Sequence, residues 1–205
     1  MKKSIGKKVG IGIAVIIVLL AAAALGFSYF FGSQVVKGLF YQNDGNDTKN
    51  NSIMQLEEWN YDLNHFTETY TEEIFTLEAS DGNTVPATFF GNDQNKDKNT
   101  AILIHGAGGD HVFTYPLAEM YLNNDWNVVT FDMRGHGDNE SPLVTFGYLE
   151  RLDVEAMVDF VREHAGTKQL VVHGQSMGGA VTGMYAITDH ARENIDAVIM
   201  DFLAK

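Results

Sequence analysis

The sequence predicts an α/β protein in which a mostly parallel sheet carries helices on both faces and a transmembrane helix precedes it. Two observations predict this class. From residue 74 onward, short apolar runs of strand length alternate with stretches of helical periodicity, which is the pattern of a parallel sheet. Before residue 38, an apolar run of 23 residues is flanked by lysines and is long enough to cross a bilayer as a helix.

The composition of the 205-residue chain excludes several classes of protein. There are no cysteines, so disulfides, thiolate zinc sites and a cysteine nucleophile are ruled out. Residues 38–205 hold 27 acidic against 9 basic side chains. Nucleic-acid binding depends on neutralising phosphates, so we expect no nucleic-acid partner and a well solvated surface.

The N-terminal segment is typical of a membrane anchor. Residues 1–8 hold four lysines, residues 9–31 are apolar, and Lys37 follows. Because cytoplasmic segments are rich in lysine and arginine, we expect residues 1–8 to be a basic cytoplasmic segment. Residues 9–31 are then a single-pass signal anchor in the cell membrane, and the remaining chain is extracytoplasmic. Secretion after signal cleavage near Ala21–Ala24 is the alternative.

Residues 32–70 are predicted to form a linker and a short helix. Asn, Asp, Gly and Ser dominate residues 42–52, which is typical of a polar linker. Apolar residues at helical spacing favour one short amphipathic helix within residues 53–70.

The strands and helices after residue 70 follow one another in a regular order. Two strands joined by a turn at Asp81-Gly82 come first, and buried strands then alternate with amphipathic helices. Right-handed crossovers are expected between the parallel strands. The predicted strands cover residues 74–79, 84–90, 100–105, 127–131, 169–173 and 195–201, and the predicted helices cover residues 113–121, 149–161 and 178–188.

The strongest chemical signal is a Gly-x-Ser-x-Gly pattern formed by Gly174, Ser176 and Gly178. It follows a predicted strand and opens a predicted helix, which is the context of a nucleophile elbow. Glycines on either side of the serine remove Cβ atoms that would collide where strand and helix pack closely. The alternatives are a plain glycine-rich turn and a phosphate-binding loop, but no Gly-Lys-Ser/Thr follows. The pattern therefore predicts that Ser176 is a nucleophile.

A second glycine-rich loop, His105-Gly106-Ala107-Gly108-Gly109, follows the third predicted strand. In acyl-transfer enzymes with this layout, the oxyanion hole uses the N–H after the nucleophile and an N–H of this earlier loop. The backbone N–H groups of Met177 and Ala107 are therefore predicted to form it, and Gly106 is a loop glycine. We expect His105 to hold the loop by hydrogen bonds rather than to act as the catalytic base.

A charged loop from Asp132 to Asp138 follows the fourth predicted strand. Its position at the carboxyl end of a strand is compatible with a functional site. We favour a structural role, in which Asp132, Arg134 and His136 link neighbouring loops by charge-assisted hydrogen bonds.

Taken in order, the patterns H-G-x-G-G, D-x-R-G-H-G and G-x-S-x-G resemble the α/β-hydrolase superfamily. The stretch HGQSMGGA after a membrane anchor is similar to bacterial membrane-anchored serine aminopeptidase-like hydrolases, which are lysophospholipase- or esterase-like. The resemblance covers about residues 70–201 and implies the N-terminal portion of an α/β-hydrolase domain in residues 71–205. The sequence departs from the family pattern at Asn139, where serine is common.

The triad order of the superfamily is serine, then an acid, then a histidine. After Ser176 the single histidine is His190. A helix of about 10 residues is about 15 Å long, so His190, at the far end of the predicted helix, is not expected to reach Ser176. We therefore expect a C-terminally truncated hydrolase, natural or incomplete in sequence, that lacks the triad acid and histidine. The acids after Ser176 are Asp189, Glu193, Asp196 and Asp201.

The motifs and the resemblance predict a serine hydrolase that cleaves an ester, amide or peptide bond through an acyl-enzyme at Ser176. The expected partners are a small-molecule ester or amide, or a peptide substrate, and the membrane through residues 9–31. No cofactor and no metal are expected, because glycines separate His105 from His111 and the two offer no convincing ligand set. The alternative is a non-catalytic truncated hydrolase or a membrane-tethered binding module.

Overall fold

The chain falls into two units, residues 1–41 and residues 42–205. The computed structural model describes residues 2–41, 47–91, 98–165 and 167–202.

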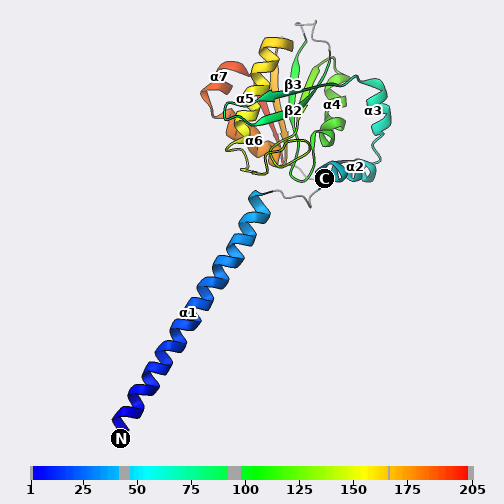
Figure 1. The fold of residues 1–205 in the computed structure, drawn as a ribbon. Helices are drawn as coiled ribbons and strands as arrows, with labels where there is room; N and C mark the ends of the chain where they lie inside the picture. The colour runs from blue at the N-terminus through cyan, green and yellow to red at the C-terminus, as the bar shows by residue number, and fades with distance from the viewer. Residues whose placement is uncertain (1, 42–46, 92–97, 166, 203–205) are drawn as a thin grey trace. The chain divides into compact units, whose positions relative to one another are not determined.

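The first unit consists, in its described part, of the long helix α1 (Lys2–Phe40) (Figure 1). The predicted membrane span at residues 9–31 lies inside this helix, which continues beyond both ends of the span. From Gly10 to Phe40 the helix is long and apolar enough to cross a membrane, and none of its most apolar stretch is buried. A signal sequence has the same properties, so these properties establish a helix of membrane-spanning length.

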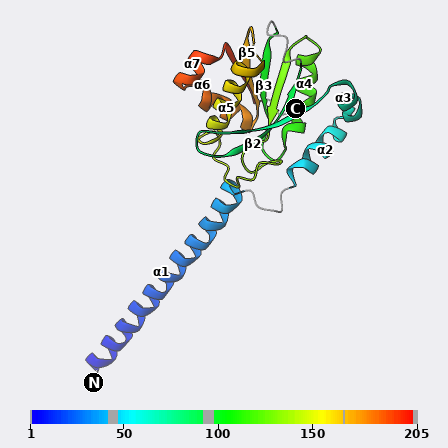
Figure 2. The same ribbon diagram turned by 45° about the horizontal axis from the view of Figure 1, so that its top comes forward.

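The second unit is built on one mixed sheet with the strand order β1-β2-β4-β3-β5-β6 (Figures 1 and 2). The first two strands form an antiparallel hairpin, and β2 is also antiparallel to β4. The remaining pairs are parallel. The sheet is therefore mostly parallel, as the alternating sequence pattern predicts. The strands are β1 (Glu73–Glu78), β2 (Thr84–Phe90), β3 (Thr100–Ile104), β4 (Asn127–Phe131), β5 (Leu170–Gln175) and β6 (Ala197–Asp201).

Helices cover both faces of this sheet. In Figures 1 and 2, α3 and α4 lie on one side of the strands, and α5, α6 and α7 lie on the other. A 3₁₀ turn, η1, leads into α4, and a π-helical turn, η2, continues α5. The helices and turns are α2 (Thr48–Glu58), α3 (Leu63–Thr69), η1 (His111–Thr114), α4 (Tyr115–Leu122), α5 (Glu150–Phe160), η2 (Val161–Ala165), α6 (Met177–Ala186) and α7 (Asp189–Asn194).

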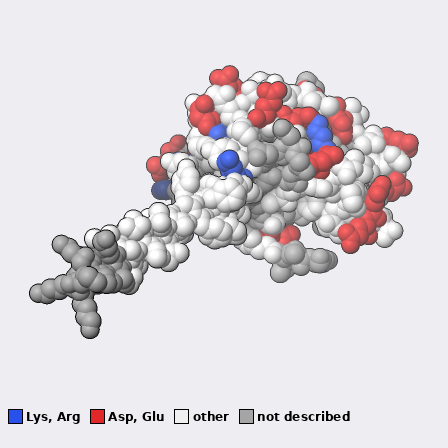
Figure 3. Space-filling view, turned by 60° about the horizontal axis from the view of Figure 1, so that its bottom comes forward, with Lys and Arg blue, Asp and Glu red and all other residues white. Residues whose placement is uncertain are grey.

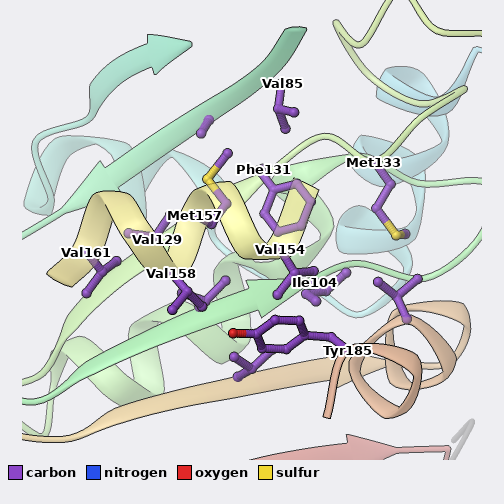
Figure 4. Close-up of a cluster of buried hydrophobic side chains, with 14 of the residues drawn as sticks. Val85, Ile104, Val129, Phe131, Met133, Val154, Met157, Val158, Val161 and Tyr185 are labelled. Atoms are coloured by element: carbon purple, nitrogen blue, oxygen red, sulfur yellow. The ribbon is translucent and has the colours of Figure 1, made fainter. Parts of the chain in front are cut away.

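Each face of the sheet has its own hydrophobic core. The larger core joins the strands to α5 and α6, where Met157 and Tyr185 pack beside Ile104 and Phe131 (Figure 4). The smaller core lies on the α4 face, where the ring of Phe66 stacks on that of Tyr115 with centroids 4.4 Å apart. Close packing on both faces explains why the inner strands are continuous apolar runs in the sequence.

The segment predicted as a polar linker at residues 42–52 is only partly described, and there the prediction is wrong. Residues 42–46 lie outside the described residues, whereas residues 48–52 form the first half of α2. The Asp47 side chain caps this helix by accepting a hydrogen bond from the Asn50 N–H, which satisfies one of the free donors at a helix start. The helix is polar because its inner face binds loops through hydrogen bonds, so its composition is that of a linker.

In two segments, the structure has two helices where the sequence predicts one. Residues 53–70 contain the end of α2 and all of α3, which Asp62 caps. The helix predicted at residues 178–188 ends at Ala186, and α7 follows, capped by Thr188. Both caps are single polar side chains within short polar stretches, which periodicity does not detect.

The surface of the second unit is acidic. Asp and Glu side chains are spread over the face shown in Figure 3, and Lys and Arg side chains are few on it. This distribution agrees with the excess of acidic residues in the sequence.

Candidate active site

Ser176 occupies a strained turn between β5 and α6. Its backbone has φ 52° and ψ −114°, a conformation that is rare for a residue with a Cβ atom and costs about 1–3 kcal/mol. The Ser176 N–H donates to the carbonyl oxygen of Asp201 at 2.7 Å, which ties the turn to the end of β6. The side chain is exposed. The turn therefore presents the Ser176 hydroxyl at the carboxyl edge of the parallel strands.

Two glycines let the strand and helix approach each other at this turn. A Cβ atom on Gly174 would lie 2.0 Å from the carbonyl oxygen of Gly178. A Cβ atom on Gly178 would lie 2.3 Å from the carbonyl oxygen of Ile104. Neither position tolerates a side chain without backbone movement, and this close approach places the start of α6 against the end of β3.

The loop after β3 lies beside Ser176. A Cβ atom on Gly106 would be 3.4 Å from the Ser176 Cβ and 3.9 Å from its Oγ. Ala107 is exposed in the turn that follows, and Met177 is the first residue of α6. The fold thus brings together the serine and the loop that sequence reasoning paired, although 70 residues separate them in the chain.

His105 is fully buried and fixes this loop. Its Nδ1 donates to the Gly106 carbonyl oxygen at 2.7 Å, and its Nε2 accepts from the Met133 N–H at 3.0 Å. The second bond requires the neutral ring, because a protonated Nε2 cannot accept. Burial, together with the neighbouring His136, lowers the pKa of His105 to about 3. The ring has the loop-holding role expected from the sequence.

His136 connects the loops after β3 and β4 in the same way. Its Nε2 accepts from the Gly108 N–H at 3.1 Å, and its Nδ1 donates to the Arg134 carbonyl oxygen at 2.8 Å. Burial lowers the pKa of His136, which keeps the ring neutral and able to accept. Two neutral histidines therefore hold neighbouring parts of one loop.

Asp132 and Arg134 form charge-assisted hydrogen bonds to neighbouring segments, as expected from the sequence. Arg134 forms a bidentate pair with Asp81 and two further bonds to Asp153, whose side chain is buried. Hydrogen bonding to Arg134 holds the pKa of Asp81 below its usual value. Asn139, where the family pattern commonly has serine, donates its side-chain amide to the Asp132 carbonyl oxygen at 2.9 Å. The charged loop is thus held from several directions.

The segments after β3 and β4 also contain a cluster of acidic and histidine side chains that the sequence did not predict. The ligand-type atoms of Asp110, His111 and Asp132 all lie within 4.8 Å of one another. His111 donates both its backbone N–H and its Nδ1–H to Asp132 Oδ1, and Asp110 accepts from the Val112 N–H. His111 and Asp132 therefore bind each other and Asp110 binds the backbone, at distances at which the three groups could also hold a cation. They come from two loops, so sequence spacing gave no signal.

His111 and Asp132 carry opposite charges that favour each other. Burial alone would lower the pKa of His111, but its hydrogen bond to Asp132 and the carboxylate charge raise it above the ordinary value. Burial alone would raise the pKa of Asp132, but the same bond and the His111 charge lower it. Both shifts favour an ion pair.

His190, the histidine that follows the serine, is engaged away from it. Its Nδ1 bonds the Tyr185 hydroxyl at 2.9 Å, and its Nε2 bonds Asp159 at 3.0 Å. These partners hold the ring beside α5 and the end of α6, in agreement with the expectation that it does not reach Ser176.

The chain is similar to known proteins over the region that carries these loops. Residues 100–201 match a family model described as the alpha/beta hydrolase fold. An uncharacterised Bacillus subtilis protein, YqkD, is 29% identical over 104 residues, which are 50% of this chain and 34% of that protein. A putative esterase/lipase 2 of Mycoplasma genitalium is 32% identical over 106 residues, which are 50% of this chain and 38% of that protein.

A solved structure with the same fold is the Pyrococcus furiosus esterase Pf2001. It superposes with a TM-score of 0.59 at 22% identity, over 69% of this chain and 54% of the esterase. The chain belongs to the α/β-hydrolase superfamily, and its second unit has that fold. It spans about a third to two fifths of the length of the two relatives named above.

Proposed function

We propose that this chain carries the nucleophile of a serine hydrolase that cleaves an ester, amide or peptide bond through an acyl-enzyme at Ser176. The observation that carries the proposal is the strained backbone of Ser176 at the strand-to-helix turn. A non-glycine residue at positive φ persists where the surrounding structure demands it, and such strain clusters at active sites. Family membership supports hydrolysis, because esterases and lipases are among the relatives.

In the proposed reaction, Ser176 Oγ attacks the carbonyl carbon of the substrate, and its proton passes to a general base. The N–H groups of Met177 and Ala107 stabilise the oxyanion of the tetrahedral intermediate, which is where such donors contribute most. Collapse of the intermediate expels the alcohol or amine with a proton and leaves an acyl-serine. Water then attacks the acyl carbon and releases the acid and the free serine.

The general base is not supplied by the histidines that hold the described site. His105 and His136 are engaged with backbone groups on both ring nitrogens, and His190 binds Tyr185 and Asp159. A serine without a base is a weak nucleophile at neutral pH. We therefore expect the 205-residue chain to turn over esters very slowly or not at all, and a longer homologous chain with a late acid and histidine to be active.

A covalent probe and a turnover assay test the two parts separately. The detergent-solubilised 205-residue chain is treated with a fluorophosphonate probe and, in parallel, with an activated ester. We expect slow labelling at Ser176, abolished by Ser176→Ala, and a hydrolysis rate several powers of ten below that of a complete homologue. Labelling that survives Ser176→Ala would remove the proposed nucleophile. Fast turnover that requires Ser176 would mean that a base is present, and His105 and His136 would be replaced next.

The alternative function is a non-catalytic, membrane-tethered binding module. It is favoured by the engagement of His190 away from Ser176. In that case Ser176→Ala would leave ligand binding unchanged, and neither probe labelling nor ester turnover would be seen.

We also propose that α1 is an uncleaved membrane anchor with the second unit outside the cytoplasm. Support comes from the apolar helix of membrane-spanning length and from the lysines that precede it in the sequence. Protease added to intact cells should digest the second unit and leave a membrane-bound fragment. Full protection in cells with an accessible surface would contradict this topology, and a soluble, shortened product would indicate signal cleavage.

A further inference from the structure

Helix α2 binds the loop beside Ser176, which follows β3, and the loop that follows β4. The Asn51 side-chain amide donates to the Gly108 carbonyl oxygen at 2.9 Å, and the Asp110 N–H donates to Ser52 Oγ at 2.8 Å. On the neighbouring loop, the Gly137 N–H donates to Thr48 Oγ1 at 2.8 Å. Lys49 adds an ion pair with Asp138.

These contacts come from one side of the helix. Residues 48, 51 and 52 are spaced three and four apart, which places them on the same helical face. Thr48 and Ser52 are buried, and a Cβ atom on Gly109 would lie 3.1 Å from Ser52 Oγ. The fit between the helix and the loop after β3 is close, and polar side chains make it.

Side chains hold four successive peptide groups of this loop. His105 binds the carbonyl of Gly106, which shares a peptide plane with the Ala107 N–H, and His136 binds the Gly108 N–H. Asn51 and Ser52 bind the next two peptide groups, through the Gly108 carbonyl and the Asp110 N–H. The first two hydrogen bonds are made by histidines of the loops themselves, and the last two are made by side chains of α2.

The backbone at Gly108 has open space beside it. It has a φ of 82°, and a Cβ atom at this position would meet no atom within 4 Å. Packing therefore restrains it little, and hydrogen bonds decide its path. Displacing a reacting group by about 1 Å can reduce a rate by about a hundredfold.

We propose that Asn51 and Ser52 are positioning residues that fix the direction of the Ala107 N–H through the Gly108 to Asp110 backbone. The proposal rests on the proposed oxyanion role of Ala107. It makes α2, the first helix of the second unit, part of the active site rather than part of a tether.

Asparagines at adjacent positions provide a matched test in the full 205-residue chain in detergent. Asn51→Ala removes the donor to Gly108, whereas Asn50→Ala removes an amide that, among the described residues, donates to the Met54 sulfur within the same helix. Asn51→Gln keeps an amide donor. Three quantities are measured for each variant: the rate of fluorophosphonate labelling at Ser176, amide hydrogen exchange over residues 106–110, and the melting temperature.

We expect Asn51→Ala to slow labelling by about threefold to tenfold, the effect of one lost hydrogen bond, and to speed exchange in residues 106–110. Asn50→Ala should change neither, Asn51→Gln should restore part of the labelling rate, and the melting temperatures of the two alanine variants should agree. Ser52→Ala should act in the same direction as Asn51→Ala.

The proposal is overturned if Asn51→Ala and Asn50→Ala label at the same rate, even where exchange differs, because Asn51 would then be structural only. If the unsubstituted chain is not labelled at Ser176, the proposed nucleophile fails instead. Exchange then decides alone whether α2 positions the loop, and equal exchange in the two alanine variants overturns that as well.

Discussion

Strands β3 and β6 have similar apolar sequences but very different surroundings. All five residues of β3 are buried, since β4 and β5 flank it and helices cover both faces. In β6, Ile199 is 42% exposed and Met200 48% exposed, and within the described residues this strand pairs with β5 alone. Apolar character alone therefore does not bury a strand. Its neighbours in the sheet do.

Both the buried inner strands and the exposed edge strand contribute to the candidate site. The loop with Ala107 follows the buried strand β3, and Ser176 follows β5 beside it. From the exposed edge, β6 supplies the Asp201 carbonyl that accepts the Ser176 N–H. Buried inner strands hold the proposed nucleophile and the proposed oxyanion donors, while one support comes from a less buried strand.

The largest difference between the centre and the edge should appear at glycines. Gly174→Ala should destabilise the second unit by about 4 kcal/mol or more, because the new Cβ would meet the Gly178 backbone. Gly183→Ala in α6 should lie within about 1 kcal/mol of the unsubstituted chain, since its Cβ would meet only the flexible Met200 sulfur at 3.1 Å and alanine favours the helix. Urea unfolding in mild detergent, followed by tryptophan fluorescence, measures both.

Equal effects of these two glycine variants would show that the close contact between Gly174 and Gly178 is relieved by local movement.

A smaller difference should separate isoleucines of the two strands. Ile102→Ala in β3 should cost about 3 kcal/mol, because it leaves a cavity in the larger core. Ile199→Ala in β6 should cost less than about 1 kcal/mol, because the side chain is already half exposed and its removal opens no cavity. The same unfolding experiment applies. A cost at Ile199 that matched the cost at Ile102 would show that β6 is covered in solution.

The smallest effect is a difference in titration between two histidines of the site loops. The His105 ring should remain neutral from pH 8 to pH 4, because its pKa is about 3, whereas His111 should become protonated above the ordinary histidine pKa. Nitrogen-15 NMR of the imidazole rings measures both. Protonation of His105 near pH 6.5 would mean that its bond from the Met133 N–H is absent in solution.

The two pKa shifts have opposite effects on how the free energy of unfolding depends on pH. The unfolded ring of His105 binds a proton below about pH 6.5 that the folded ring does not, so its contribution weakens as pH falls from 6.5 toward 3. The folded His111 holds its proton more tightly than the unfolded one, so its contribution is fully present below about pH 6.5 and is lost as pH rises through its raised pKa. Replacing each histidine with asparagine should remove the corresponding slope from the unfolding free energy.

The sequence by itself determined the strands, most helices and the strand-to-helix turn at Ser176. Period-two and continuous apolar runs locate the strands, and Gly174, Ser176 and Gly178 specify a turn that few other residues permit. These features can be read from local sequence patterns. Buried strands give recognisable apolar runs, and a glycine at a close backbone contact cannot be replaced by a residue with a side chain. The role of His105 as a support for the loop was also predictable, because the residue follows directly on a buried strand.

The tertiary structure alone decided that α2 exists as a helix docked on the loops, that α7 is separate from α6, and that Asp110, His111 and Asp132 meet. In each case the deciding interaction joins residues distant in sequence or depends on a single capping side chain, such as the 57-residue separation between Asn51 and Gly108. A polar helix held by hydrogen bonds has no apolar stripe, so its composition is the same as that of a linker. What separates this helix from a linker is the loop after β3, which the fold brings beside it and to which its side chains bind.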